Sequence, residues 1–331
     1  MTVRIAFLGT PEVAMPALDA LLAADDLEVA VVITNPDRPK GRSRTPVAPP
    51  VKQAAEAAGV PVWQPNKPVE ILDDLAALEL DACAVVAYGA ILPASVLAAS
   101  RLGFVNLHFS LLPRWRGAAP VQHAIRAGDE VTGVTTFVLD PGMDTGPVID
   151  RVEVAIDPAE SSGELLERLA TIGAPVLVGS IRALADGAQP TPQPDVGATL
   201  APKITPDDVR IDFDAPARTV ADLIRSADPA PGAHTTLRGD RLKIHRVTPI
   251  VASTDDATVE VRGEPGEIVG VTKKAVLVAC ADGAVQLDAV QPIGKARMDG
   301  AAFANGYRPQ VGEKLGERLG ERLGERLGSD A

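Results

Sequence analysis

Aromatic residues, cysteine and histidine are all scarce in this chain of 331 residues. Phe, Trp and Tyr make up 3% of it, so Ala, Val, Leu and Ile must fill the core. The two cysteines, Cys83 and Cys280, lie far apart in apolar runs. They supply neither a disulfide framework nor a cysteine-based zinc site. We therefore expect two buried, reduced thiols and no metal.

Long hydrophobic runs and an excess of positive charge are missing as well. No apolar run approaches the ~18 residues that cross a bilayer, and the first nine residues enter a strand pattern without a charged leader. We expect a cytoplasmic protein with no membrane partner. The net charge of −12 excludes a wholly basic coat for nucleic acid but leaves a local basic patch open.

Two nucleotide-binding motifs are also absent from the sequence. The first turn, residues 9–16, lies where a dinucleotide-binding protein has GxGxxG, yet Gly9 is its only glycine. Without the other glycines the backbone has no provision for approaching a pyrophosphate, which argues against NAD and FAD. GxxxxGK[ST] does not occur, so a P-loop is excluded too. The sequence predicts no nucleotide cofactor.

Composition and hydrophobic patterning divide the chain into four parts. Residues 1–188 alternate apolar strand patterns with helix patterns, which predicts an α/β fold: a Rossmann-like, doubly wound, mostly parallel sheet. Residues 189–208 are rich in proline and are interpreted as a linker. Residues 209–311 contain short strand patterns between turn signals, typical of a small β-barrel (OB-like) domain. Residues 312–331 repeat glycine at every fourth position, which disfavours a helix. We expect this low-complexity tail to have no packed role, so that its deletion changes neither activity nor melting temperature.

Residues 35–52 form a basic stretch within the acidic first part. Five basic residues face only Asp37 there, a charge of +4. Five prolines exclude a helix or a central strand, and the loop is longer than usual. Contact with phosphate and a solvated, self-repelling charge run explain this loop equally well from composition.

Three polar residues predict chemistry near the middle of the chain. Asn106 and His108 alternate in a strand pattern and so project from one face. Asp144 follows the next strand and is expected across the crevice from His108. Such a set suits transfer of an acyl group to an amine, because the amine loses a proton and the intermediate carries an oxyanion. Two hydrogen-bonded core residues are the structural alternative. No Ser, Cys or Lys lies in a nucleophile motif, which favours direct transfer without a covalent enzyme intermediate.

Five motifs carry a resemblance to a known family. They are FLGTPEVAMPAL, NPDRPKGR, VVAYGAILP, NLHFSLLPRWRGAAPVQHAI and TFVLDPGMDTGPVI, and they extend with their surroundings from residue 3 to about residue 311. The chain resembles the methionyl-tRNA formyltransferase family. The resemblance implies transfer of formyl from 10-formyltetrahydrofolate, as co-substrate, to the α-amino group of methionine on initiator tRNA. It also implies contacts between the C-terminal domain and the tRNA.

The resemblance also implies a role for individual residues. The catalytic residues would be Asn106 and His108 at the oxyanion and Asp144 in control of the proton. The folate-binding residues would be Ser110, Leu111, Leu112, Pro113, Val86, Tyr88, Gly89, Leu92 and Asp140. The tRNA-binding residues would be Arg38, Lys40, Arg42 and Arg44, which decides in favour of phosphate contact for the basic stretch. We expect a monomer.

Two departures and two alternatives accompany this resemblance. Phe109 stands where many members have a small residue, and the C-terminal domain lacks tryptophans often found in the family. A folate enzyme that acts on a small amine or on water is the first alternative, opposed by the basic loop and the extra domain. A non-catalytic nucleic-acid-binding protein is the second, opposed by the complete set of Asn106, His108 and Asp144.

Overall fold

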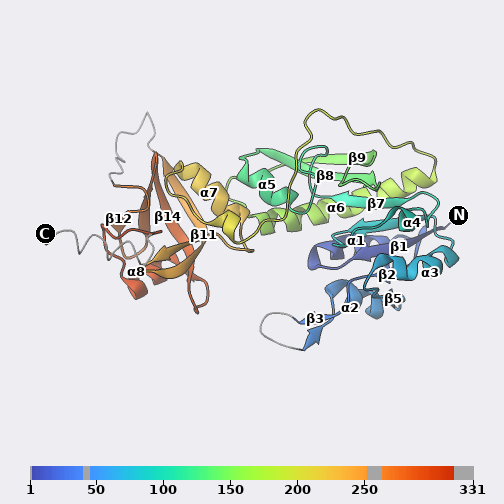
Figure 1. The fold of residues 1–331 in the computed structure, drawn as a ribbon, viewed down its shortest axis with the longest axis horizontal. Helices are drawn as coiled ribbons and strands as arrows, with labels where there is room; N and C mark the ends of the chain where they lie inside the picture. Colours follow the sequence, from blue (N-terminus) through green and yellow to red (C-terminus); the bar gives the residue numbers. More distant parts are fainter. Residues whose placement is uncertain (1, 40–44, 252–262, 317–331) are drawn as a thin grey trace. The chain divides into compact units, whose positions relative to one another are not determined.

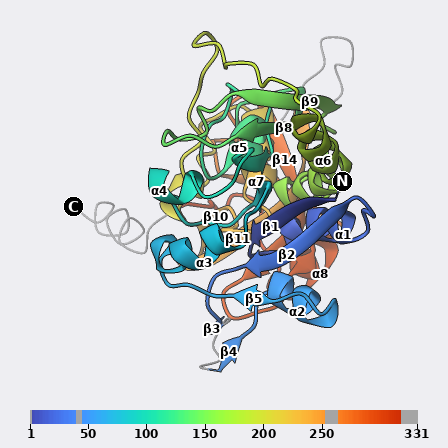
Figure 2. The same cartoon turned by 90° about the vertical axis from the view of Figure 1, so that its right-hand side faces the viewer.

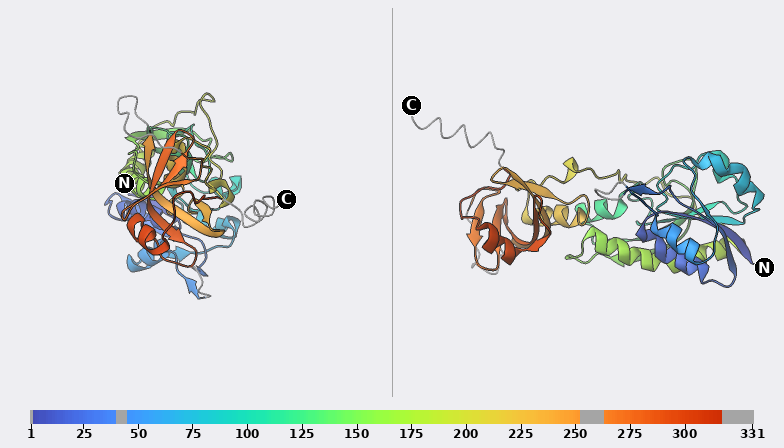
Figure 3. Two further views of the ribbon diagram at one scale, coloured as in Figure 1. Left: turned by 90° about the vertical axis from the view of Figure 1, so that its left-hand side faces the viewer. Right: turned by 90° about the horizontal axis from the view of Figure 1, so that it is seen from below.

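The computed structural model describes residues 2–39, 45–251 and 263–316. The chain forms two compact units, each drawn in Figures 1 and 3. The first unit comprises Met1–Val121, Val131–Ile156 and Glu164–Pro202. The second unit comprises Gln122–Glu130, Asp157–Gly163 and Lys203–Ala331.

A seven-stranded sheet forms the centre of the first unit. Its strands are β1 (Val3–Gly9), β2 (Leu27–Ile33), β5 (Val62–Trp63), β6 (Ala82–Val86), β7 (Phe104–His108), β8 (Val131–Val138) and β9 (Val148–Ala155). Their order is β5-β2-β1-β6-β7-β8-β9. The pairs from β5 to β7 are parallel, whereas β8 pairs antiparallel with β7 and β9. The predicted Rossmann-like, mostly parallel sheet is confirmed.

Helices cover both faces of this sheet (Figure 2). They are α1 (Met15–Leu22), α2 (Pro50–Ala57), α3 (Leu72–Ala77), α4 (Ala94–Leu97) and α6 (Ser162–Ala185). Short 3₁₀ turns lie at Glu12–Ala14 and Pro68–Ile71, and a further helix, α5, spans Pro120–Arg126. On one face, Leu75 of α3 and Val96 of α4 pack with Phe104 of β7. On the other face, Gly173 of α6 lies against Leu107. β6 is buried throughout, which explains its continuous apolar run.

Among the described residues, α6 is long and apolar enough to cross a membrane by length and composition. The expectation that no stretch of the chain reaches this length is therefore wrong. Half of its apolar window is buried, and Leu165, Leu169, Leu177 and Ile181 are fully shielded from solvent. Ser180 also shares a hydrogen bond of 2.6 Å with Thr136 of β8. These contacts are those of a core helix that covers the sheet.

A curled antiparallel sheet forms the second unit. Its strands are β10 (His234–Leu237), β11 (Asp240–Val251), β12 (Ile268–Val271), β13 (Val276–Cys280), β14 (Gly283–Pro292) and β15 (Met298–Asp299). Their order is β10-β11-β14-β13-β12, and β15 pairs with β14. The unit also contains a 3₁₀ turn (Asp207–Val209), helices α7 (Ala217–Ser226) and α8 (Gly300–Tyr307) and most of α5. Its core contains Ile224, Leu287 and Phe303.

Both cysteines are buried and unbonded, as predicted. Burial raises the pKa of the Cys83 thiol and of the Cys280 thiol to about 12 each. Neither thiol forms a thiolate at neutral pH, so both act as small apolar side chains.

The start of the tail is part of the second unit's core. Leu315 is 3% exposed and packs in the apolar cluster. The amide of Ile268 donates to Glu313 O, and the amide of Leu315 donates to Gly266 O, each at 2.8 Å. The expectation of a tail with no packed role is therefore wrong for residues 312–316, because one leucine of the repeat reaches the core beside β12. Residues 317–331 lie outside the described residues.

The described parts of the basic stretch form a short ribbon. β3 (Arg38–Pro39) pairs antiparallel with β4 (Pro46–Val47), and both are exposed. Lys52 lies in α2, where its Nζ is 3.0 Å from the Asp37 carboxylate. This ion pair neutralises one of the five positive charges. Lys40, Arg42 and Arg44 lie outside the described residues.

Candidate active site

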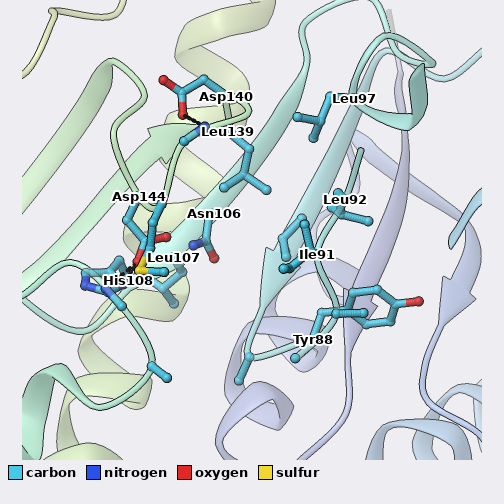
Figure 4. Close-up of a pocket in the computed structure, with 18 of the residues that line it drawn as sticks. Tyr88, Ile91, Leu92, Leu97, Asn106, Leu107, His108, Leu139, Asp140 and Asp144 are labelled. Carbon is cyan, nitrogen blue, oxygen red and sulfur yellow. Dashed lines mark hydrogen bonds and ion pairs between the residues drawn. The ribbon is translucent and has the colours of Figure 1, made fainter. Parts of the chain in front are cut away.

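A cavity of about 620 Å³ opens in the first unit where β6 and β7 end. Its walls come from the loop after β6, from the end of β7 and from the loop between β8 and β9 (Figure 4). Most of the lining is apolar, including Ile91, Leu92, Leu97 and Leu139. Asn106, His108 and Asp144 are polar residues of the lining, and Figure 4 shows them together on the wall opposite Tyr88 and Leu92.

His108 is the buried group of this wall, with a side chain 6% exposed. Its Nε2 lies 2.9 Å from the carbonyl oxygen of Trp115. A carbonyl only accepts, so Nε2 carries a proton and donates. The neutral ring therefore holds its lone pair on Nδ1, which lies 3.7 Å from Asp144 Oδ2. The ring of Phe137 stands edge-on to the imidazole, with centroids 6.3 Å apart.

Burial controls the charge of His108. It lowers the pKa of the imidazole below the ordinary 6.5, and the Asp144 carboxylate opposes this shift by stabilising the charged form. The burial effect is the larger one, so the ring is neutral at pH 7. A neutral imidazole with its lone pair on Nδ1 can accept a proton from a reacting amine.

Asp144 occupies a position determined by its loop. Its Oδ2 accepts a hydrogen bond of 2.7 Å from the amide of Gly117. Its backbone is left-handed, with φ +53°, which is uncommon for a residue with a side chain. Within the same loop, Asp140 accepts hydrogen bonds from the Thr145 hydroxyl at 2.7 Å and from the Gly142 amide at 3.0 Å. These bonds shape the turn that carries Asp144.

Asn106 lies two residues before His108 on the same face of β7, as the alternation predicts. Its side chain is half-buried and lines the cavity. Within the part of the chain that the structure describes, the side-chain amide of Asn106 makes no hydrogen bond. The Nδ2 group can therefore donate to a ligand in the cavity.

Comparisons with known proteins show which family the chain belongs to. A family model described as "Formyl transferase" matches residues 3–181, and one described as "Formyl transferase, C-terminal domain" matches residues 203–308. Methionyl-tRNA formyltransferase of Streptomyces griseus is 49% identical over 315 residues, covering 94% of this chain and 99% of the relative. The chain belongs to the methionyl-tRNA formyltransferase family. The enzyme of that name from Thermobifida fusca is also 49% identical, with the same coverage.

Solved structures share the fold of this formyltransferase. HypX from Aquifex aeolicus in complex with tetrahydrofolic acid has a TM-score of 0.65 at 19% identity, covering 95% of this chain and 49% of HypX. The sugar 3N-formyl transferase WlaRD, solved with dTDP and 5-N-formyl-THF, has a TM-score of 0.62 at 18% identity, covering 89% of this chain and all of WlaRD.

The predicted catalytic and folate-binding residues of this formyltransferase differ in where they lie relative to the cavity. The three predicted catalytic residues come together at one end of the cavity. Of the nine predicted folate-binding residues, four line the cavity: Tyr88, Gly89, Leu92 and Asp140. The other five are outside the lining, and three of them, Val86, Ser110 and Leu112, are buried.

Residues 110–113 therefore lie outside the cavity lining, and their contact with folate stays a prediction. The Ser110 hydroxyl donates to Arg114 O at 2.6 Å, and the Leu112 amide donates to the Thr135 hydroxyl at 3.1 Å. This turn supports the segment that leads to Trp115. It holds the partner of His108 and does not line the cavity itself.

Sequence reasoning did not single out two exposed apolar side chains of the cavity. Ile91 is 92% exposed and Met143 is 64% exposed, and both line the cavity. Large exposed apolar residues at a cavity are typical of ligand contact. The motifs VVAYGAILP and DPGMDTG contained them, but sequence alone does not distinguish these residues from core ones. Among the described residues, no three His, Cys, Asp or Glu side chains are placed to hold a metal ion.

Proposed function

We propose that this protein transfers the formyl group of 10-formyltetrahydrofolate to the α-amino group of methionine on initiator methionyl-tRNA, with Asn106, His108 and Asp144 as its catalytic residues. The observation that carries the assignment is the neutral, buried His108, whose Nδ1 faces Asp144 at the end of an apolar cavity. The cavity has room for the pterin of the donor, with Ile91, Leu92 and Met143 as apolar contacts.

The reaction is one acyl transfer between two nitrogens. The methionyl amine attacks the formyl carbon, and the carbonyl oxygen becomes an oxyanion that Asn106 Nδ2 stabilises by donation. His108 can donate to this oxyanion from Nδ1 only after Nδ1 has taken up the proton of the amine. The attacking nitrogen gives up a proton, which Nδ1 of neutral His108 accepts, and the Asp144 carboxylate stabilises the resulting imidazolium. The bond from carbon to N10 of the folate then breaks, and N10 takes up the proton held on His108 Nδ1, which restores the neutral imidazole. No enzyme acyl intermediate is formed.

A formylation assay tests this function directly. The protein is mixed with 10-formyltetrahydrofolate and methionine-charged initiator tRNA, with charged elongator tRNA in parallel. We expect formyl-methionine on the initiator alone. No transfer to either tRNA, with the folate still bound, would instead favour a formyltransferase acting on a small amine, or a folate hydrolase.

The basic stretch is the proposed site of contact with the tRNA, through Arg38, Lys40, Arg42 and Arg44. We expect Arg42→Ala to raise KM for tRNA and to flatten its dependence on salt by about one unit of slope, because each lost phosphate contact releases one counterion fewer. KM for the folate should not change. Arg151→Ala, at an exposed position of β9, is the matched control. An unchanged salt slope would remove Arg42 from the interface.

The pH dependence of kcat should report on His108. The groups that face its imidazole are the Asp144 carboxylate, the Trp115 carbonyl and the Phe137 ring. Because burial lowers the pKa of His108 below 6.5, the neutral base persists as the pH falls from 8 to 6.5. We expect kcat to be flat over that range and to fall only at lower pH, after correction for the stability of the donor. A midpoint of the acid limb above 6.5 would contradict this role.

The remaining expectations complete the proposal. Translation is a cytoplasmic process, and a cytoplasmic monomer without metal or nucleotide cofactor fits the chemistry. Sedimentation in the presence and absence of tRNA tests the monomer. Activity in excess chelator tests independence from metal.

A further inference from the structure

Residues 191–201, predicted as a linker, are an ordered strap on the first unit. Thr191 exchanges main-chain hydrogen bonds of 2.7 and 2.8 Å with Val148, next to the loop of Asp144. Further along, the Arg116 amide donates to Thr199 O at 2.8 Å, and the Ala201 amide donates to Arg116 O at 2.7 Å. The strap thus joins the two loops that face each other around His108.

Two side chains of the strap turn toward these loops. From 191 to 200 every residue is exposed except Gln193 and Thr199, which are half-buried. The segment is rich in proline and otherwise exposed, so the burial of these two polar side chains requires an explanation. Their hydrogen bonds supply it.

Gln193 links the Asp144 loop to the Arg116 loop. Its Nε2 donates to Asp144 O at 2.9 Å and to Gly146 O at 2.8 Å. Its Oε1 accepts from the Arg116 guanidinium at 2.8 and 3.1 Å. A primary amide offers two donors and an acceptor in this arrangement, whereas a carboxylate would place an oxygen against two carbonyls.

Thr199 holds the other partner of His108. Its hydroxyl accepts a hydrogen bond of 2.8 Å from the Trp115 amide, and the Trp115 carbonyl accepts from His108 Nε2. The carbonyl of Ala201 also lies against Gly117, where a Cβ would come within 2.7 Å of it. Gly117, with φ +124°, is therefore required for the strap to approach the amide that binds Asp144.

Both partners of His108 have left-handed backbones. Trp115 has φ +65° and Asp144 has φ +53°. Residues with side chains persist in this region only where surrounding contacts hold them. The strap supplies such a contact to each: Thr199 to Trp115 and Gln193 to Asp144.

We propose that Gln193 and Thr199 are positioning residues of the formyl transfer, which hold Asp144 and Trp115 so that the two remain aligned with His108. This inference rests on the proposed function, because it assumes that Asp144 acts in the reaction. It makes the segment between the two family-model matches part of the catalytic machinery.

A double-mutant cycle of Gln193→Ala and Asp144→Asn tests the proposal. We expect Gln193→Ala to lower kcat about tenfold, since misplacing a catalytic group affects the chemical step, with KM for folate and tRNA within twofold. In the Asp144→Asn background it should cause no further loss, because its effect passes through the lost carboxylate. Gln189→Ala is the matched control, since the Gln189 amide donates only to the nearby Gly187 O.

The outcomes separate this inference from the proposed function. If Asp144→Asn keeps near-normal kcat, the proposed catalytic residues are wrong. If Asp144→Asn loses activity but Gln193→Ala does not, or if their losses multiply, only the positioning role fails. A rise in KM alone would overturn it as well.

Thr199 supplies an independent pair of variants, which decides the question if Gln193→Ala does not fold. Thr199→Val keeps the shape but loses the oxygen that accepts from the Trp115 amide, whereas Thr199→Ser keeps it. We expect a several-fold loss of kcat in the valine variant, with KM unchanged, and recovery in the serine variant. Equal activities in the two variants would overturn the role of Thr199.

Discussion

Replacement of Asp144 by Asn should lower kcat on the order of 10²-fold or more while leaving the fold intact. The amide keeps an oxygen that can accept from the Gly117 amide, now 2.7 Å from Oδ2. What it loses is the negative charge 3.7 Å from His108 Nδ1, which stabilises the imidazolium formed when the amine is deprotonated. Single-turnover kinetics with saturating folate and tRNA separate this loss from binding.

A charge-matched control accompanies that substitution. Asp150→Asn removes the same charge from an exposed position of β9, where the Asp150 carboxylate accepts a hydrogen bond from the amide of Arg151. We expect kcat of this variant to stay within twofold of the parent. A near-normal kcat for Asp144→Asn, with the control also unaffected, would remove Asp144 from the mechanism.

Leu315→Ala should lower the free energy of unfolding by about 2–4 kcal/mol, the cost of emptying a leucine site in a packed core. Leu315 is 3% exposed among the apolar residues of the second unit. Denaturant unfolding followed by hydrogen exchange in β12 and α8 measures the change. Val311→Ala is the control, because Val311 is 63% exposed and its truncation removes little buried area.

Two truncated chains test the contribution of residues 312–316 to stability. A chain ending at 311 loses Leu315, the Glu313 ion pair with Arg238 at 3.0 Å and the main-chain bonds beside β12. We expect it to be less stable than a chain ending at 316, which keeps them all. Equal stability of the two chains would mean that residues 312–316 add nothing to the core.

Local sequence patterns predicted the positions of much of the site. The alternation of Asn106 and His108 in an apolar strand placed both on one face, and the strand before Asp144 placed that residue at the same edge of the sheet. These inferences held because strand periodicity is a property of neighbouring residues. The family motifs then supplied the chemistry. Folate binding by Ser110 to Pro113 stays a prediction, because these residues lie outside the cavity lining and a motif identifies a turn but not the direction of its side chains.

The strap could not be predicted in the same way. Gln193 contacts a residue 77 positions away, and Thr199 contacts one 84 positions away. Proline-rich composition led to the interpretation of 189–208 as a linker and gave no sign of these contacts. A single leucine in a repeat with glycine at every fourth position gave no sign that Leu315 reaches the core. Each of these contacts depends on which distant backbone groups the fold leaves without partners.

By itself the sequence determined the α/β architecture, a small β-barrel-like C-terminal domain, the buried thiols and the strand that presents Asn106 and His108. Hydrophobic periodicity and turn-forming residues act over a few positions, so they can be recognised from the sequence without a structure. Only the tertiary structure decided that Asp144 faces Nδ1 of His108, that burial keeps the imidazole neutral, and that a proline-rich strap holds both partners of the ring. Those features arise where segments far apart in the chain exclude water and satisfy one another's hydrogen bonds.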